Sequence, residues 1–267
     1  MSSGSEKGGK KAGLCLTYRA CGLAVTGRAW YTVGEMVHFR LFGIPVVIHP
    51  SMWVILAVLA VLCVGDPLQA PLAVLLFMMA GFLTLLAHEM GHAVVGRYLL
   101  KGETNVYLAW LGGECFYEGP TPGRGESLLL TVAGPLGSLA LAPVVLLVMN
   151  LYLPSTADVL PAAWDMVCWT MPREMLQAMP VYGAMLLLFL LQLSVWWSLL
   201  NLLPVYPLDG GRVLAHFMGS RRRMHTASMV IAAVLSLAAF SMGMVLLGSM
   251  LIFLVVANYN AREGADD

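Results

Sequence analysis

Charged residues are scarce in this sequence. Asp, Glu, Lys and Arg make up only 11% of its 267 residues, whereas about a quarter of a soluble domain is charged. Hydrophobic residues make up 59% and gather in long apolar runs. This composition excludes an ordinary soluble protein and predicts an integral membrane protein in contact with the lipid bilayer. The formal net charge of zero also lacks the basic excess of a nucleic-acid-binding surface, so we expect no nucleic acid partner.

Cysteine pairs and a signal peptide are missing as well. The five cysteines form no CxxC pair, so the sequence predicts neither a zinc knuckle nor a disulfide framework. The N-terminal region lacks the apolar core of a secretory signal peptide. We therefore expect residues 1–36 to be a flexible, basic, cytoplasmic segment, residues 37–263 to form one membrane-embedded domain, and residues 264–267 to be a short C-terminal tail.

The apolar runs predict membrane-spanning helices. A helix needs about 20 mainly apolar residues to cross the hydrocarbon core. By this measure four runs predict one span each: residues 50–66, 72–98, 127–151 and 182–203. The last run, residues 226–259, is too long for one ordinary span, and we expect two short helices joined by a tight turn near 242–249. The predicted fold is therefore an all-α polytopic membrane protein with about six transmembrane helices.

A small interfacial β element accompanies the predicted helices. Residues 37–51 are rich in β-branched side chains and are interrupted by Gly43 and Pro45, which indicates an extended strand before the first span. Residues 104–126 have a Gly-Gly centre and predict a hairpin after the second span. We expect residues 153–180 to form a longer loop with a partly amphipathic middle.

The distribution of basic residues predicts the orientation. With six spans, both termini lie on one side of the membrane, and every lysine and arginine except Arg173 falls on that side. The positive-inside rule places that side in the cytoplasm. We therefore expect a multi-pass protein of the cytoplasmic (inner) cell membrane with both termini in the cytoplasm.

Three ionisable side chains interrupt the second predicted span, in the stretch LTLLAHEMGHAVV (83–95). His88 and His92 are four residues apart and share one helix face, so both can bind a single zinc ion. Glu89 is placed to act as the general base that takes a proton from a zinc-bound water. The competing interpretation is a chance match whose histidines bond to neighbouring helices, but such groups in an apolar span are costly unless they are paired or bind a metal.

A catalytic zinc needs a third protein ligand and an open position for water. Asp209 follows two prolines in NLLPVYPLDGGRV (201–213). Pro204 and Pro207 must break the helix, and a broken helix at membrane depth is tolerated only against protein or a water-filled cavity. Asp209 is therefore a candidate third ligand. In the competing interpretation the helix simply ends at the membrane surface and Asp209 caps the next one.

Glu114 and Glu118, in the predicted hairpin, are rival third ligands. A membrane-embedded peptidase of the gluzincin type would use one of them and cut soluble or surface peptides. A zinc transporter or another non-catalytic metal-binding membrane protein would hold the ion without needing Glu89. A non-catalytic scaffold would need none of these residues.

Three motifs together resemble the site-2 protease family of intramembrane zinc metalloproteases: HEMGH (88–92), AGPLGS (133–138) and NLLPVYPLDGGRV (201–213). GIPVVIHPS and FLVVANYNARE are similar to the ends of the bacterial members, so the resemblance covers roughly residues 37–263. It implies one zinc ion per chain, with Glu89 as catalytic base and three ligands, His88, His92 and Asp209. It also implies a short member without a PDZ insert or a C-terminal regulatory domain.

The resemblance further implies regulated intramembrane proteolysis, in which peptide bonds within or next to transmembrane helices of membrane protein substrates are hydrolysed. Asn201 resembles the asparagine of the family motif and would hydrogen-bond the scissile carbonyl or its oxyanion. Helix–helix hydrogen bonding is the competing interpretation for Asn201. Pro204 and Pro207 expose main chain that we expect to contact the substrate, and residues 37–48 or 104–118 are expected to pair with its unwound segment. A regulatory membrane partner and a homo-oligomer both stay open.

Overall fold

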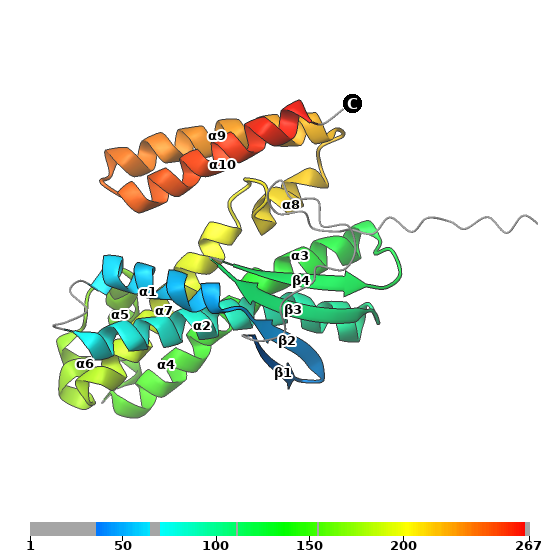
Figure 1. Cartoon of the computed structure of the whole chain (residues 1–267). Helices are drawn as coiled ribbons and strands as arrows, with labels where there is room; N and C mark the ends of the chain where they lie inside the picture. Colours follow the sequence, from blue (N-terminus) through cyan, green and yellow to red (C-terminus); the bar gives the residue numbers. More distant parts are fainter. Residues whose placement is uncertain (1–35, 65–69, 111, 154, 265–267) are drawn as a thin grey trace, which may run out of the picture.

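A computed structural model describes residues 36–64, 70–110, 112–153 and 155–264 of the chain (Figure 1). This part is mostly helical and contains one four-stranded sheet. The predicted flexible, basic N-terminal segment falls outside the described residues except for its last residue, and so does the predicted C-terminal tail except for its first.

Within the described residues, five helical segments are long and apolar enough to cross a membrane. They are α2 (Pro71–Val94) with its continuation η1 (Val95–Leu99), α3 (Arg124–Leu139) with α4 (Leu141–Tyr152), α7 (Val181–Asn201), α9 (Arg221–Ser241) and α10 (Val245–Glu263). The first predicted span forms α1 (Pro50–Val64), which is apolar but has only 15 residues. The described residues thus form a largely helical, polytopic architecture with five candidate spans and one shorter apolar helix.

The long C-terminal apolar run divides into two helices, as its length predicts. α9 ends at Ser241 and α10 begins at Val245, so the turn is shorter than the expected 242–249. Gly243 has a φ of +76°, a left-handed conformation that glycine adopts without steric cost. The two helices lie side by side (Figure 1).

The segment between α4 and α7 is not the loop that we expected. It contains two short helices, α5 (Thr156–Val167) and α6 (Arg173–Ala178). Met166 and Met175 are fully buried in a cluster with residues of α4 and α7. α7 also satisfies the end of α5, because the Gln192 amide donates to the Met166 carbonyl and the Trp196 indole donates to the Val167 carbonyl. Packing against α7 therefore stabilises helices that the sequence pattern alone shows only weakly.

The β structure is one sheet with the order β1-β2-β3-β4. The expected hairpin after α2 is present as β3 and β4, but the prediction of a single strand before α1 is wrong because β1 and β2 form a second hairpin. Phe42 and Gly43 both have positive φ, +49° and +71°. Positive φ at both central residues is typical of the two-residue turns that join antiparallel strands. β2 pairs with β3 in parallel. The strands are β1 (Val37–Leu41), β2 (Ile44–Ile48), β3 (Glu103–Ala109) and β4 (Gly112–Glu118).

Alternation along the inner strands attaches the sheet to α2. Every second residue of β2 and β3 is buried, so one face of the sheet is apolar. This face packs in one cluster with α1 and α2, and the members from β2, β3 and α2 are Ile44, Val46, Ile48, Val106, Leu108, Leu85, Met90 and Ala93. The sheet is thereby held beside the half of α2 that carries the ionisable residues.

Glycines allow α2 and α3 to approach closely. A Cβ atom on Gly91 of α2 would strike the Ala133 carbonyl, and one on Gly137 of α3 would strike the Ala87 carbonyl. Small residues at such contacts are how transmembrane helices gain van der Waals packing without a hydrophobic driving force.

We expect Gly137→Ala to destabilise the protein by about 1–3 kcal/mol, because the added methyl group forces two helix backbones apart. Gly125→Ala in the same helix is the matched control, since a Cβ there meets no atom within 4 Å, and alanine favours a helix by up to ~1 kcal/mol. Thermal unfolding in detergent measures both. An equal or higher unfolding temperature for Gly137→Ala than for Gly125→Ala would contradict this packing.

Candidate metal centre

The C-terminal half of α2 carries three buried ionisable residues. His88, Glu89 and His92 expose only 4%, 6% and 6% of their surface. They are enclosed because α3 and α7 pack on one part of α2 and the sheet packs on another. Their burial means that protein groups or a bound ion must replace water as their partners.

Asp209 reaches the same place from a distant part of the chain. α7 ends at Asn201, and a loop with Pro204 and Pro207 leads to α8 (Asp209–Ala215). α8 lies so close to this loop that a Cβ on Gly210 would strike the Leu202 carbonyl. Asp209 is only 3% exposed, and the residue at the N-cap position is Leu208. The carboxylate therefore does not serve as a helix cap and points to the two histidines.

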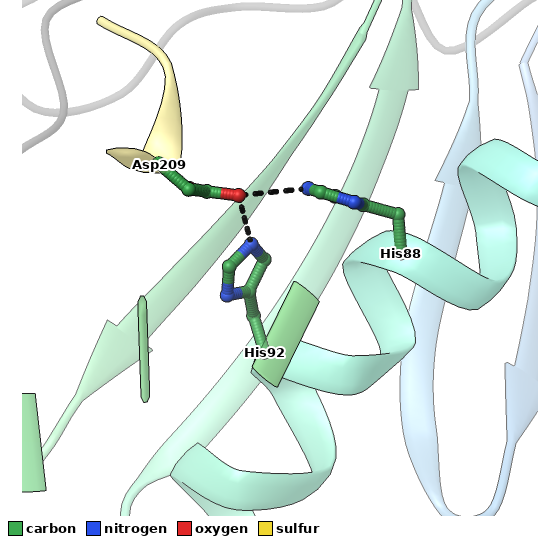
Figure 2. Close-up of side chains that lie close together, drawn as sticks. All are labelled: His88, His92 and Asp209. Carbon is green, nitrogen blue, oxygen red and sulfur yellow. Dashed lines mark ion pairs between the residues drawn. The ribbon is translucent and has the colours of Figure 1, made fainter. Parts of the chain in front are cut away.

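The three side chains converge on one point (Figure 2). Asp209 Oδ2 lies 3.0 Å from His88 Nε2 and 3.4 Å from His92 Nε2. One ligand atom from each residue lies within 4.8 Å of the others. Two imidazole nitrogens and one carboxylate oxygen can hold a divalent metal ion in this arrangement.

The polar atoms of these side chains that face away from the centre contact other protein groups. His92 Nδ1 donates to the Leu130 carbonyl at 2.7 Å, so its hydrogen lies on Nδ1 and the lone pair of Nε2 faces the centre. His88 Nδ1 lies 3.4 Å from Ser138 Oγ, and Arg212 Nη1 donates to Asp209 Oδ1 at 3.1 Å. Metal-binding histidines commonly have this second hydrogen bond, which fixes the ring and its tautomer.

Asp209 Oδ2 is the atom that fits a metal best. It is buried and has no hydrogen bond among the described residues. A buried carboxylate oxygen that accepts no hydrogen bond is costly in a protein interior, and a cation between it and the two Nε2 atoms would satisfy all three. The donor set of two histidines and one carboxylate is one that zinc accepts in catalytic sites.

The stretch AGPLGS of α3 lies against the two histidines. A Cβ on Gly134 would strike the His92 ring, so this position needs glycine. Ser138 Oγ contacts His88 Nδ1 and also lies 2.8 Å from Ser198 Oγ of α7. Ser138 was not among the predicted site residues, although it lies in a stretch that the resemblance singles out.

Glu89 has a close neighbour in β4 that the sequence analysis did not identify. A Cβ on Gly113 would strike the Glu89 side chain, so the main chain of β4 passes directly beside the carboxylate. The only signal in the sequence was the Gly-Gly centre of the predicted hairpin. β4 therefore covers Glu89, and a residue larger than glycine at position 113 would collide with its side chain.

The rival ligands lie elsewhere on β4. Glu114 is half-buried and pairs across the sheet with Tyr107, and Glu118 pairs with Glu103. Among the described residues, neither belongs to the group that can hold a metal. Burial and the nearby charge of Glu89 raise the pKa of the Glu114 carboxyl.

The remaining predicted site residues surround the Asp209 loop. Asn201 is buried at the end of α7, and its Nδ2 donates to the Trp197 carbonyl at 2.9 Å. Pro204 and Pro207 are partly exposed in the loop. Contact of any of the three with a substrate stays a prediction.

Comparison with known proteins extends the resemblance beyond the short motifs. No protein-family model matches the chain. It is 28% identical over 233 residues to a zinc metalloprotease of Methanocaldococcus jannaschii, covering 85% of this chain and 58% of that relative, so the chain spans less than two thirds of the relative's length. A solved structure, the site-2 protease from Methanocaldococcus jannaschii, matches with 22% identity and a TM-score of 0.49 over 86% of this chain and 93% of that chain. The relative's name agrees with the metal-binding motifs, so the similarity of this chain to a zinc metalloprotease, the class that the motifs indicated, is confirmed.

Proposed function

We propose that this chain is an intramembrane zinc metalloprotease that hydrolyses peptide bonds within or next to the transmembrane segments of membrane protein substrates. The observation that carries the proposal is the convergence of His88, His92 and Asp209 on one buried point, with Glu89 on the same helix. The similarity to a protein named zinc metalloprotease supports the same activity.

In this proposal His88, His92 and Asp209 hold one zinc ion per chain. Three protein ligands leave one position of a tetrahedral site for water. Zinc bound there would lower the pKa of that water to ~7 and polarise the carbonyl of the substrate. The hydrogen bonds of Leu130 and Ser138 keep the histidine rings turned toward the ion.

Glu89 is the proposed general base. Its carboxylate takes a proton from the attacking water and passes it to the leaving amine. The main chain of β4 at Gly113 lies against the carboxylate and limits where it can move. The side chain is only 6% exposed, so bulk solvent has little access to the carboxylate.

Asn201 is proposed to donate to the scissile carbonyl or its oxyanion. A side-chain amide nitrogen carries two hydrogens, and the Trp197 carbonyl accepts one of them. The second can serve the substrate, and the bond to Trp197 would orient it.

The proposed substrate approach uses the edge of the sheet. A helical substrate hides its carbonyl groups in hydrogen bonds within the helix, so it must unwind before it is cut. β4 is an edge strand and can add an extended segment by main-chain pairing. Of the two edges, β4 is the better candidate because its Gly113 contacts Glu89. Pro204 and Pro207 are proposed to contact the same substrate segment. We also propose that the protein lies in the cytoplasmic membrane with both termini on the cytoplasmic side.

The proposed ligand set predicts the metal content of the protein and of its variants. Protein purified in detergent should contain about one zinc per chain by elemental analysis, as a site with three protein ligands requires. His92→Ala and Asp209→Ala should lose the metal, whereas Glu114→Ala should keep it. Zinc retained in Asp209→Ala and lost in Glu114→Ala would instead support a peptidase of the gluzincin type.

The role of Glu89 separates a protease from a metal-binding or transport protein. Glu89→Gln should keep the zinc but reduce cleavage of a model transmembrane substrate by at least about 100-fold, because it removes the base and leaves the ligands. Gel-based cleavage assays and metal analysis of the same sample measure the two effects. Unchanged cleavage by Glu89→Gln would refute the catalytic assignment.

The contact of β4 with Glu89 predicts a steric effect. Gly113→Ala should slow cleavage on the order of 100-fold, since a shift of the base by about 1 Å is enough for such a loss, while the zinc content stays the same. Gly219→Ala is the control, because a Cβ there meets no atom within 4 Å. Equal cleavage rates for the two variants would show that Gly113 does not place Glu89.

A further inference from the structure

Both main-chain groups of Tyr206 are held by side chains of the α9–α10 pair. The Tyr206 N–H donates to Ser228 Oγ of α9 at 3.0 Å, and Asn258 Nδ2 of α10 donates to the Tyr206 carbonyl at 2.6 Å. Tyr206 lies between Pro204 and Pro207, which have no N–H of their own. The loop before Asp209 therefore depends on α9 and α10 for part of its main-chain hydrogen bonding.

The residues that hold Tyr206 are buried and have defined orientations. Ser228, Asn258 and His225 expose 0%, 1% and 3% of their surface. Asn258 Nδ2 also donates to the Leu254 carbonyl, and its Oδ1 accepts from His225 Nδ1 at 3.0 Å. The His225 ring meets the Tyr206 ring edge-on at 5.2 Å. Both N–H groups and the oxygen of the Asn258 amide therefore have hydrogen-bond partners. Loss of any of these hydrogen bonds would leave a buried polar group unpaired.

The loop lies directly against the first turn of α8, which begins with Asp209. A Cβ on Gly211 would strike the Tyr206 nitrogen, and one on Gly210 would strike the Leu202 carbonyl. The first turn of α8 therefore rests on the loop main chain with no side chain between them. Val205 is fully buried in a cluster with residues of α9 and α10, so apolar packing acts in the same direction as the hydrogen bonds.

The candidate ligands share one support, α3, and Asp209 has a second one in the α9–α10 pair. His88 and His92 lie on α2, which α3 and the sheet hold. Asp209 lies on α8, which packs on α3 and also rests on the loop that α9 and α10 hold. At the end of α8, His216 Nε2 lies 2.8 Å from Ser127 Oγ of α3, and Figure 1 shows α8 between the α9–α10 pair and the remaining helices. The distance between the carboxylate and the histidines therefore depends on α3 and, through Tyr206, on the α9–α10 pair.

We propose that Asn258 and Ser228 are positioning residues that set the place of the Asp209 carboxylate through the main chain of Tyr206. The inference rests on the proposed function, because it takes Asp209 to be the third zinc ligand. Neither side chain is proposed to contact the ion or the substrate. Each acts by keeping α8 in the position in which Asp209 Oδ2 lies close to the Nε2 atoms of His88 and His92.

A purely structural role is the alternative, and the chain offers a matched control for it. Ser236 of α9 is fully buried and donates to the Gly248 carbonyl of α10 at 2.9 Å. Ser236→Ala removes a buried hydrogen bond from the same helix pair without touching the loop. Loss of stability alone would affect this variant as it affects the variants at 228 and 258.

The test compares Asn258→Leu, Ser228→Ala and Ser236→Ala in the full chain in detergent. Zinc affinity is measured by competition with a chelator, and the visible absorption of the Co²⁺-substituted protein reports the ligand geometry. We expect Asn258→Leu to weaken zinc binding about tenfold or more, in the range seen when partners of metal ligands are removed, and to shift the Co²⁺ bands. Ser228→Ala should change both in the same direction to a smaller extent, and Ser236→Ala should match the wild type in both.

Equal zinc affinity and equal Co²⁺ spectra in all three variants would overturn the proposal, whatever their melting temperatures. If Asn258→Leu does not fold, Ser228→Ala decides, since it removes only one acceptor. Cleavage by the wild type is measured in parallel. A wild type that binds zinc but does not cleave overturns the proteolytic function alone, because the comparison of affinities needs no activity; a wild type that binds no zinc overturns both.

Discussion

The structure depends on the cost of burying ionisable groups in an apolar interior. His88, Glu89, His92 and Asp209 lie together with almost no exposure, and each needs a partner in place of water. Leu130 and Ser138 of α3 and Arg212 of α8 provide partners for the two histidines and Asp209. Gly113 of β4 lies against Glu89. Asp209 Oδ2 has no hydrogen bond among the described residues, and it lies 3.0 Å and 3.4 Å from the Nε2 atoms of His88 and His92. A metal ion between these three atoms would be bound by all of them.

Close approach of main chains makes this arrangement possible. α3 reaches the histidines because Gly134 and Gly137 have no side chain, β4 reaches Glu89 through Gly113, and α8 rests on its loop through Gly210 and Gly211. A methyl group at most of these contacts would strike main-chain atoms or a ring that cannot move aside. The glycines in the three motifs therefore reflect steric limits around a buried polar site, as well as the tendency of membrane helices to pack through small residues.

Much of the architecture follows from local patterns, and the exceptions have physical causes. The apolar runs predicted the helices closely, including the division between α9 and α10, because a helix of given length and composition either suits a bilayer or does not. The number of spans follows less directly from the sequence, because the first predicted span forms α1, which has only 15 residues. Residues 153–180 were expected to be a loop, but α5 and α6 form because α7 accepts their apolar side and caps α5. The strand before α1 became a hairpin because Phe42 and Gly43 adopt left-handed conformations, which the residue types permit without requiring.

The sequence by itself determined that His88 and His92 share a face with Glu89 beside them, because helix geometry relates residues four apart without help from the rest of the chain. It also showed that the helix must break before Asp209, because proline has no N–H to continue it. Only the tertiary structure decided that Asp209 and not Glu114 joins the histidines, that Gly113 contacts Glu89, and that Asn258 and Ser228 hold the loop. These are contacts between distant segments, and their distances depend on how whole helices pack, which no local pattern encodes.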